Sequence, residues 1–146
     1  MNGDQADISA PQSGAVYVFE RTADSWRQDA YVKASNTDPA DWFGYSIALS
    51  DGVLAVGAAF ESSPTSGLDG EQSDNGSVAS GAAYLFHRLA GVWEQQNYVK
   101  ASNSDAQDSF GTAVALSASA GTLVVSAIGE DSGAPGIGGE QADNSL

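Results

Sequence analysis

The chain has no cysteine in its 146 residues. Disulfides and thiolate metal sites are therefore excluded, and cysteine usage says nothing of the redox compartment. No apolar run approaches the ~20 residues that a membrane helix needs, which argues against membrane insertion. The first residues, Met-Asn-Gly-Asp, also lack the pattern of a signal peptide, so no leader is predicted within this sequence.

Positive charge is scarce. Five lysines and arginines oppose 19 aspartates and glutamates, which gives a net charge of −14. Nucleic acid needs clustered cations that displace counterions, so nucleic acid is excluded as a partner. An anionic membrane surface is disfavoured for the same reason. The excess carboxylate fits either a solvated acidic surface or the binding of divalent cations.

Strong helix formers are also few, whereas 17 glycines separate short apolar runs. Those runs are rich in valine and aromatic residues and are bounded by Gly, Ser, Asn and Asp, a pattern typical of strands and turns. Hydrophobic residues make up 42% of the chain and charged residues only 16%, so a packed core is expected. The composition predicts an all-β domain.

The most informative feature is an internal repeat. Residues 31–36 and 98–103 both read Tyr-Val-Lys-Ala-Ser-Asn, 67 positions apart. Residues 13–19 (Ser-Gly-Ala-Val-Tyr-Val-Phe) match residues 80–86 (Ser-Gly-Ala-Ala-Tyr-Leu-Phe) at the same spacing. A repeat of this length is a structural unit that stacks on copies of itself.

One complete unit runs from residue 43 to residue 100. Its apolar runs predict four antiparallel strands over residues 44–49, 53–58, 81–87 and about 92–100. Asp51-Gly52 predicts a tight hairpin between the first two strands, because both central residues tolerate φ > 0. A long polar loop spans residues 59–80, and a second turn lies near residues 89–91.

The second and third strands are apolar on both faces, so we expect neighbouring sheets to cover both sides. The fourth strand alternates, with Trp93, Gln95, Asn97 and Val99 expected on one face, which suits an outer edge. A four-stranded sheet that is covered on both faces by its own repeats is a β-propeller blade. We therefore predict propeller blades of four antiparallel strands, about two blade repeats per chain.

Several residues suit packing between blades. Phe43-Gly44 and Phe110-Gly111 begin the first strand of each repeat, where a missing side chain lets backbones approach closely and the Phe can wedge between blades. Trp26 and Trp93 occupy matching positions near the third-to-fourth strand turn, so both are expected to pack. Trp42 has Ser109 as its counterpart and is therefore a candidate for a contact surface instead.

These motifs resemble the FG-GAP repeats of the integrin α-subunit propeller and of bacterial surface proteins. Phe43-Gly44 resembles the FG element, residues 56–59 (Val-Gly-Ala-Ala) the GAP element without its proline, and residues 14–19 the third strand. The resemblance implies an extracellular or cell-surface adhesion module, or a fragment of one. Many relatives bind calcium between the first two strands, but residues 50–52 and 118–121 offer at most one carboxylate there, too few for that ion.

Calcium remains a hypothesis at other acidic positions, and no other cofactor is predicted. The long loop and the segments before each Phe-Gly carry the candidate ligands, which are Asp69, Glu71, Asp74, Asp38, Asp41, Asp105 and Asp108. The alternative is that these are solvated loop acids that stabilise turns through their own backbone. A calcium-dependent module that binds carbohydrate or protein is thus the second functional hypothesis.

An enzyme is the least favoured hypothesis. The single histidine, His87, is replaced by Glu20 in the matching position, and no base–nucleophile pair is visible. No pair of carboxylates is singled out for glycoside hydrolysis either. We predict no catalytic residue.

Residues 1–146 form a single repeat domain whose two ends fall within blades and not between them. Residues 2–42 hold strands three and four of one blade plus a linker, residues 43–100 a whole blade, and residues 101–146 a linker, strands one and two of the next blade and a loop whose residues 139–143 repeat residues 3–7. Each half blade has an unpaired edge, which is unfavourable in water. We expect the chain to associate head to tail into a closed homo-oligomer, a trimer of six blades or a tetramer of eight.

Overall fold

A computed structural model describes residues 3–142, and all of the regular structure in that range is β. The eight strands are β1 (Val16–Arg21), β2 (Trp26–Val32), β3 (Ser46–Ser50), β4 (Val53–Ala58), β5 (Ala82–Leu89), β6 (Val92–Val99), β7 (Phe110–Ser117) and β8 (Thr122–Ala127). Residues 1–2 and 143–146 of the predicted domain, and with them the end of the 139–143 repeat, lie outside the described residues. The described part contains no helix that could span a membrane.

The central sheet is the predicted four-stranded unit. Its strands pair antiparallel in the order β3-β4-β5-β6, and hairpin turns join β3 to β4 and β5 to β6. In the first turn Asp51 and Gly52 have φ of 46° and 76°, which is the geometry that the Asp-Gly pair predicts. The all-β fold with one complete unit between two partial ones confirms the predicted fold class.

Strand β6 departs from the simple alternation expected of it. Leu85 pairs with Asn97 whereas Phe86 pairs with Gln95, so one extra residue in β6 makes a bulge. The bulge turns the side chains of Asn97 and Val99 to the face opposite Trp93 and Gln95, and the prediction that all four share one face is wrong.

The far end of β6 is also not an open edge. The long loop returns beside it, where the Asp69 amide donates to the Tyr98 carbonyl at 2.8 Å and the Lys100 amide donates to the Gly67 carbonyl at 2.8 Å. Leu68 and Val99 form the corresponding bridge. The loop thus covers the strand that sequence analysis assigns to the edge, which lowers the exposure of unpaired backbone groups.

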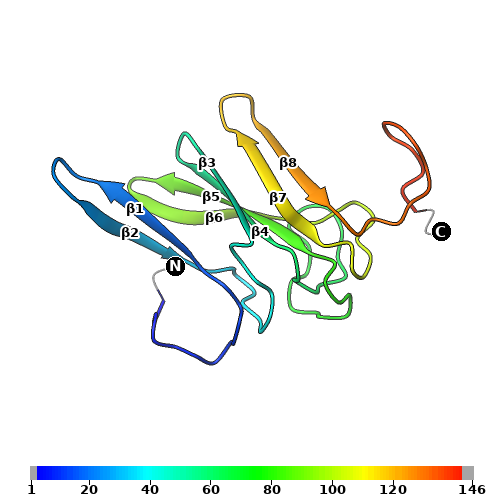
Figure 1. Ribbon diagram of the computed structural model, residues 1–146, viewed down its shortest axis with the longest axis horizontal. Coiled ribbons are helices and arrows are strands. Elements are labelled where there is room, and N and C mark those ends of the chain that lie inside the picture. Colours follow the sequence, from blue (N-terminus) through cyan, green and yellow to red (C-terminus); the bar gives the residue numbers. More distant parts are fainter. Residues whose placement is uncertain (1–2, 143–146) are drawn as a thin grey trace.

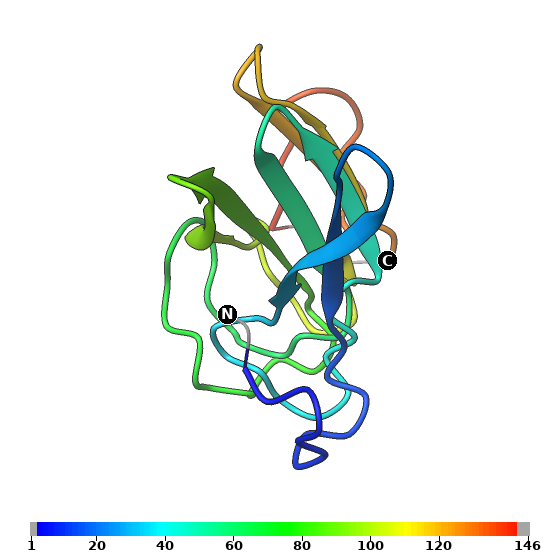
Figure 2. The ribbon, with the colours of Figure 1, turned by 90° about the vertical axis from the view of Figure 1, so that its left-hand side faces the viewer.

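Two-stranded sheets flank the central one. Sheet β1-β2 lies on one side of it and β7-β8 on the other, so that the three sheets follow one another across the molecule (Figure 1). The turned view shows the same succession from the β1-β2 side (Figure 2). Each flanking hairpin is half of a unit: β1-β2 correspond to β5-β6, and β7-β8 correspond to β3-β4.

The core lies between β1-β2 and the central sheet. Val16, Ala30 and Val32 pack there against the fully buried rings of Tyr84 and Phe86. Phe43 meets both rings edge-on, with centroid separations of 5.3 Å and 5.9 Å. Burying each large side chain stabilises the fold by roughly 1.5–3 kcal/mol, so these aromatic groups dominate the packing between units.

Polar contacts fasten the same two sheets at their outer ends. Arg88 of β5 lies 3.0 Å from the Asp29 carboxylate and 3.3 Å from that of Glu20. The Trp93 indole also donates to Asp29, at 3.2 Å. Since Asp29 and Glu20 belong to the β1-β2 hairpin, these contacts join neighbouring units directly.

Close backbone contacts join successive units at their inner ends. Gly14 bridges Phe43, and Gly81 bridges Phe110 in the same way. A Cβ on Gly14 would lie 2.0 Å from the Phe43 carbonyl oxygen, and one on Gly81 would lie 2.1 Å from that of Phe110. Both glycines have φ of 81°, so two independent reasons exclude a side chain at these junctions.

Candidate functional site

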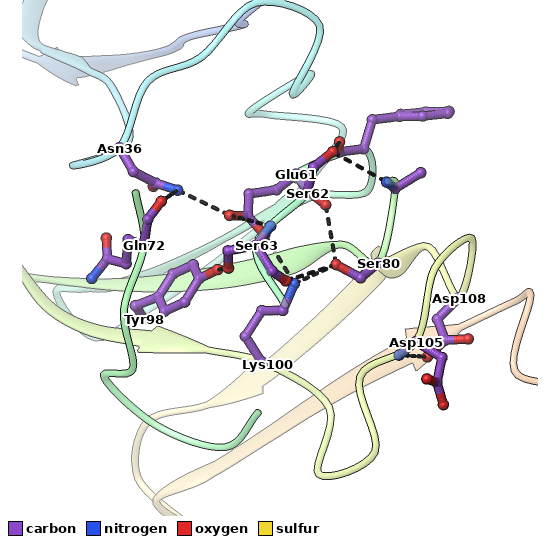
Figure 3. A network of polar contacts seen from close by, with 12 residues as sticks. Asn36, Glu61, Ser62, Ser63, Gln72, Ser80, Tyr98, Lys100, Asp105 and Asp108 are labelled. Carbon is purple, nitrogen blue, oxygen red and sulfur yellow. Dashed lines mark hydrogen bonds and ion pairs between the residues drawn. The ribbon is translucent and has the colours of Figure 1, made fainter. Parts of the chain in front are cut away.

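Two buried charged side chains form an ion pair between the long loop and the end of β6. Lys100 Nζ lies 2.9 Å from Glu61 Oε2, and their side chains are 0% and 1% exposed. The ammonium also donates to Ser80 Oγ at 2.7 Å (Figure 3). A buried charge is stable only when it is paired and hydrogen-bonded, and this pair meets both conditions.

The second carboxylate oxygen of Glu61 is satisfied as well. Asn36 Nδ2 donates to Oε1 at 3.0 Å, and the Ser63 amide donates to it at 3.2 Å. The hydroxyls of Ser63 and Tyr98 bond each other beside the pair (Figure 3). Because Asn36 follows β2 and Glu61 follows β4, this network ties one unit to the next.

Burial perturbs the titration of this region. Desolvation lowers the pKa of Lys100, although the Glu61 carboxylate opposes that shift. Asp41 lies close by and is 4% exposed. Burial raises the pKa of Asp41 to about 7, assisted by repulsion from Glu61 and opposed by the hydrogen bond from the Asp38 amide.

The long-loop carboxylates that are predicted as calcium ligands accept hydrogen bonds from protein groups. Asp69 accepts from the Tyr98 amide at 2.8 Å and from Asn97 Nδ2 at 2.9 Å. Glu71 Oε1 accepts from the amide and hydroxyl of Ser73. These bonds lower the pKa values of both Asp69 and Glu71. Asp74 is exposed, and its carboxylate lies near Gly76.

The carboxylates before each Phe-Gly behave alike in both copies. Asp41 Oδ2 accepts from the Asp38 amide at 3.0 Å, and Asp108 Oδ2 accepts from the Asp105 amide at 2.8 Å. Across residues 3–142 no three acidic, histidine or cysteine side chains gather as a metal site would require. Asp41 and Asp108 thus each accept a hydrogen bond within their own turn.

The two copies of each packing residue have different surroundings. Trp93 is 5% exposed against β1-β2, whereas Trp26 is 68% exposed. Phe43 is 2% exposed, whereas Phe110 is only partly buried. Gly44 and Gly111 both have φ of 94° and approach the carbonyl oxygens of the preceding unit.

Trp42 lies in a small exposed aromatic cluster. Its ring stacks on Tyr45 at a centroid separation of 6.1 Å and contacts Phe60 at 4.7 Å. The matching residues of the other repeat are Ser109, Thr112 and Gly129, none of which is aromatic. Only one copy of the repeat therefore carries the cluster.

The structure adds a surface that sequence analysis does not identify. Tyr17 and Phe19 of β1 are 50% and 54% exposed, and Ile47 and Leu49 of β3 are 58% and 63% exposed. We call these four side chains the open face. They lie on the sides of β1-β2 and β3 that point away from β7-β8, and no described element covers them. The sequence carried one indication of this surface. Tyr17 and Phe19 match Tyr84 and Phe86, which are buried, but the blade of β1-β2 lacks its first two strands within the chain.

The family comparison agrees with the repeat geometry. The FG-GAP repeat family matches residues 26–86 and 93–141, which together make up more than half of the chain. Among curated proteins and solved structures nothing matches. Two adjoining matches, the paired Phe-Gly junctions and a complete four-stranded unit lead to one conclusion: this chain belongs to the FG-GAP repeat family.

Proposed function

We propose that the chain is a non-catalytic scaffold in which β7-β8 of one copy and β1-β2 of the next complete a shared blade. The same contact repeated head to tail gives a closed ring, with six blades in a trimer or eight in a tetramer. Such a heterologous contact closes when the rotation between copies divides a full turn.

One observation carries this proposal: equivalent side chains are buried in the complete unit and exposed in the half unit. Tyr84 and Phe86 are 0% exposed, whereas their counterparts Tyr17 and Phe19 are about half exposed. Tyr84 and Phe86 are covered by β1-β2 of the preceding unit and by Phe43. A second copy would bring the equivalent cover, including its own Phe110.

The complete unit also supplies the register of the contact. Ala58 of β4 pairs with Ala82 of β5. The repeat equates Ala58 with Ala127 and Ala82 with Ala15, so Ala127 of one copy should face Ala15 of the next. Strands β8 and β1 each carry a free edge within the described residues, and pairing them satisfies both.

Native mass spectrometry at micromolar concentration tests the association, and a folded monomer as the main species would refute it. The register is tested in the cysteine-free chain by combining Ala15→Cys with Ala127→Cys. Oxidation should give disulfide-linked multimers on a non-reducing gel. The control pair, Ala15→Cys with Ser117→Cys, places the second thiol at the far end of β7 and should stay largely uncrosslinked.

The assembled scaffold is proposed to act at a cell surface, outside the cell, as an adhesion or interaction module. Family membership supports this role, and a protein or glycan is the proposed ligand. The aromatic cluster of Trp42, Tyr45 and Phe60 is the proposed contact surface, because only one repeat carries it and exposed aromatic rings suit sugar or protein contacts.

A glycan array probed with wild type, Trp42→Ser and the control Ser109→Thr tests this surface. Trp42→Ser installs the residue of the other repeat, so folding should be preserved. Loss of a glycan signal only in Trp42→Ser supports the surface. Equal signals from all three proteins refute it.

A further inference from the structure

We propose that a buried ion pair between Lys33 of one copy and Glu130 of the next locks the shared blade. This inference rests on the proposed function, since the two residues meet only when β7-β8 and β1-β2 of different copies join. It assigns a specificity role to two charged residues that belong to opposite ends of the chain.

The template is the ion pair within the complete unit. Glu61 follows β4, Lys100 follows β6, and the two lie 2.9 Å apart in a buried site. By the repeat, Glu130 follows β8 and Lys33 follows β2. These are the strands that the proposed contact places in one blade.

The surroundings of Glu130 reproduce those of Glu61 apart from the lysine. Asn103 Nδ2 donates to Glu130 Oε2 at 2.8 Å, and the matching Asn36 donates to Oε1 of Glu61. The Ser132 amide donates to Glu130 Oε1 at 3.0 Å, as the Ser63 amide does to Glu61 Oε1. The same two donor groups therefore hold both carboxylates, but they bind both oxygens of Glu130 and only one oxygen of Glu61, so a lysine would share Glu130 Oε2 with Asn103.

The surroundings of Lys33 reproduce those of Lys100 apart from the carboxylate. Lys33 Nζ donates to Ser13 Oγ at 2.6 Å, as Lys100 does to Ser80 at 2.7 Å. It also donates to the Gly14 carbonyl, at 2.6 Å. Partial burial lowers the pKa of Lys33, attraction to Asp41 and Asp7 opposes that shift, and the carboxylate of Glu130 would oppose it further.

A cavity lies at the position that the missing carboxylate would enter. It has a volume of about 300 Å³ and is lined by Ser13, Tyr31 and Lys33, and on the side of the N-terminal segment by Asp4 and Asp7. In the complete unit their counterparts Ser80, Tyr98 and Lys100 all contact the segment 61–63. The equivalent segment of the next copy, residues 130–132, has the chemistry to fill the cavity.

Further contacts of the complete unit predict two changes that should occur together with the Lys33–Glu130 ion pair. The Tyr84 hydroxyl donates to Asn36 Oδ1 at 2.7 Å, so the exposed Tyr17 should donate to Asn103 of the next copy. Residues 3–7 and 139–142 are copies of the segment at 70–74, and only one of them can occupy that position in a shared blade. Asn103 Nδ2 donates to the Gln141 carbonyl as Asn36 does to that of Gln72, so residues 139–142 already hold this position and residues 3–7 must move away from Lys33 for the contact to form.

Charge reversal tests the lock because each variant alone opposes like charges at every contact. Lys33→Glu places two carboxylates together, and Glu130→Lys places two ammonium groups together. Each should associate at least about 100-fold more weakly than wild type. The double variant Lys33→Glu with Glu130→Lys should assemble again, since it restores an opposite-charge pair at every contact, whatever the number of copies in the ring. Native mass spectrometry should then find the double variant in assemblies with the same number of chains as wild type.

The outcomes separate the two proposals. A monomeric wild type overturns blade sharing, and the lock with it. An assembling wild type with single variants that assemble equally well, or with a double charge-reversal variant that fails to recover assembly, overturns the lock alone. Circular dichroism checks that each variant is folded. The milder variants Lys33→Met and Glu130→Gln remove charge without reversing it, and each alone should weaken association about 10-fold or more.

Discussion

The buried Lys100–Glu61 pair gives the sharpest prediction for the complete unit. Replacing Lys100 with methionine keeps most of the side-chain volume but leaves the Glu61 carboxylate buried without a cation. At the observed 2.9 Å, the attraction lost is about 6 kcal/mol for an effective dielectric constant near 20. The bonds from Asn36 and Ser63 remain and offset part of that loss. We expect the free energy of unfolding at pH 7 to fall by about 3–5 kcal/mol.

The double variant Glu61→Gln with Lys100→Met isolates the charge. Glutamine can still accept from Asn36 and Ser63, and no ion remains buried, so the double variant should lie within about 1–2 kcal/mol of wild type. Lys33→Met is the matched control, because no carboxylate among residues 3–142 of the same copy lies within ion-pair distance of Lys33. Urea unfolding followed by tryptophan fluorescence, at one fixed protein concentration, measures all four proteins. A free energy of unfolding for Lys100→Met within about 1 kcal/mol of wild type would refute the reasoning.

Three further predictions concern single residues. Asp41→Asn should flatten the pH dependence of stability between about pH 4 and 7, because the pKa of about 7 makes folded wild type hold a proton that the unfolded chain has already lost. Wild-type stability should therefore fall as pH rises through this range, by at most about 4 kcal/mol, and an unchanged slope for Asp41→Asn in thermal melts would contradict this. Gly81→Ala should destabilise the fold by more than about 2 kcal/mol, because it adds the strain of a positive φ to a backbone clash. In Gly52→Ala the new Cβ meets nothing within 4 Å, so this control should cost only about 1 kcal/mol. Equal losses of unfolding free energy in urea titration would contradict the close junction at Gly81. Trp93→Ala should cost about 3–5 kcal/mol, whereas Trp26→Ala should mainly weaken association, and equal loss of folding stability in both would count against the unit packing.

Much of the fold could be predicted because the repeat is local in sequence. Apolar runs, the Asp51-Gly52 turn and two Phe-Gly pairs specify strands, a hairpin and the unit boundaries without reference to distant residues. The bulge in β6 could not be predicted, since one inserted residue is visible only against its partner strand. The position of the loop beside β6 likewise depends on contacts made after the sheet has formed.

The candidate site likewise has features that the sequence predicts and features that only the folded structure shows. The sequence predicts acidic residues as metal ligands, and the structure shows that Asp69 and Glu71 accept hydrogen bonds from protein donors. The ion pair joins residues 39 positions apart, and nothing in the sequence distinguishes Glu61 from the other acidic residues of the chain. Only the folded chain shows that Glu61 is the carboxylate that is buried with a lysine.

The sequence by itself determined that the chain is built from repeated four-stranded units, because strand and turn preferences act over a few residues and recur at a fixed spacing. Tertiary structure decided which copy of each repeated residue is covered. Tyr84 is buried and Tyr17 is exposed although the two stand at the same position of the repeat, since burial depends on the neighbouring unit and not on the residue itself.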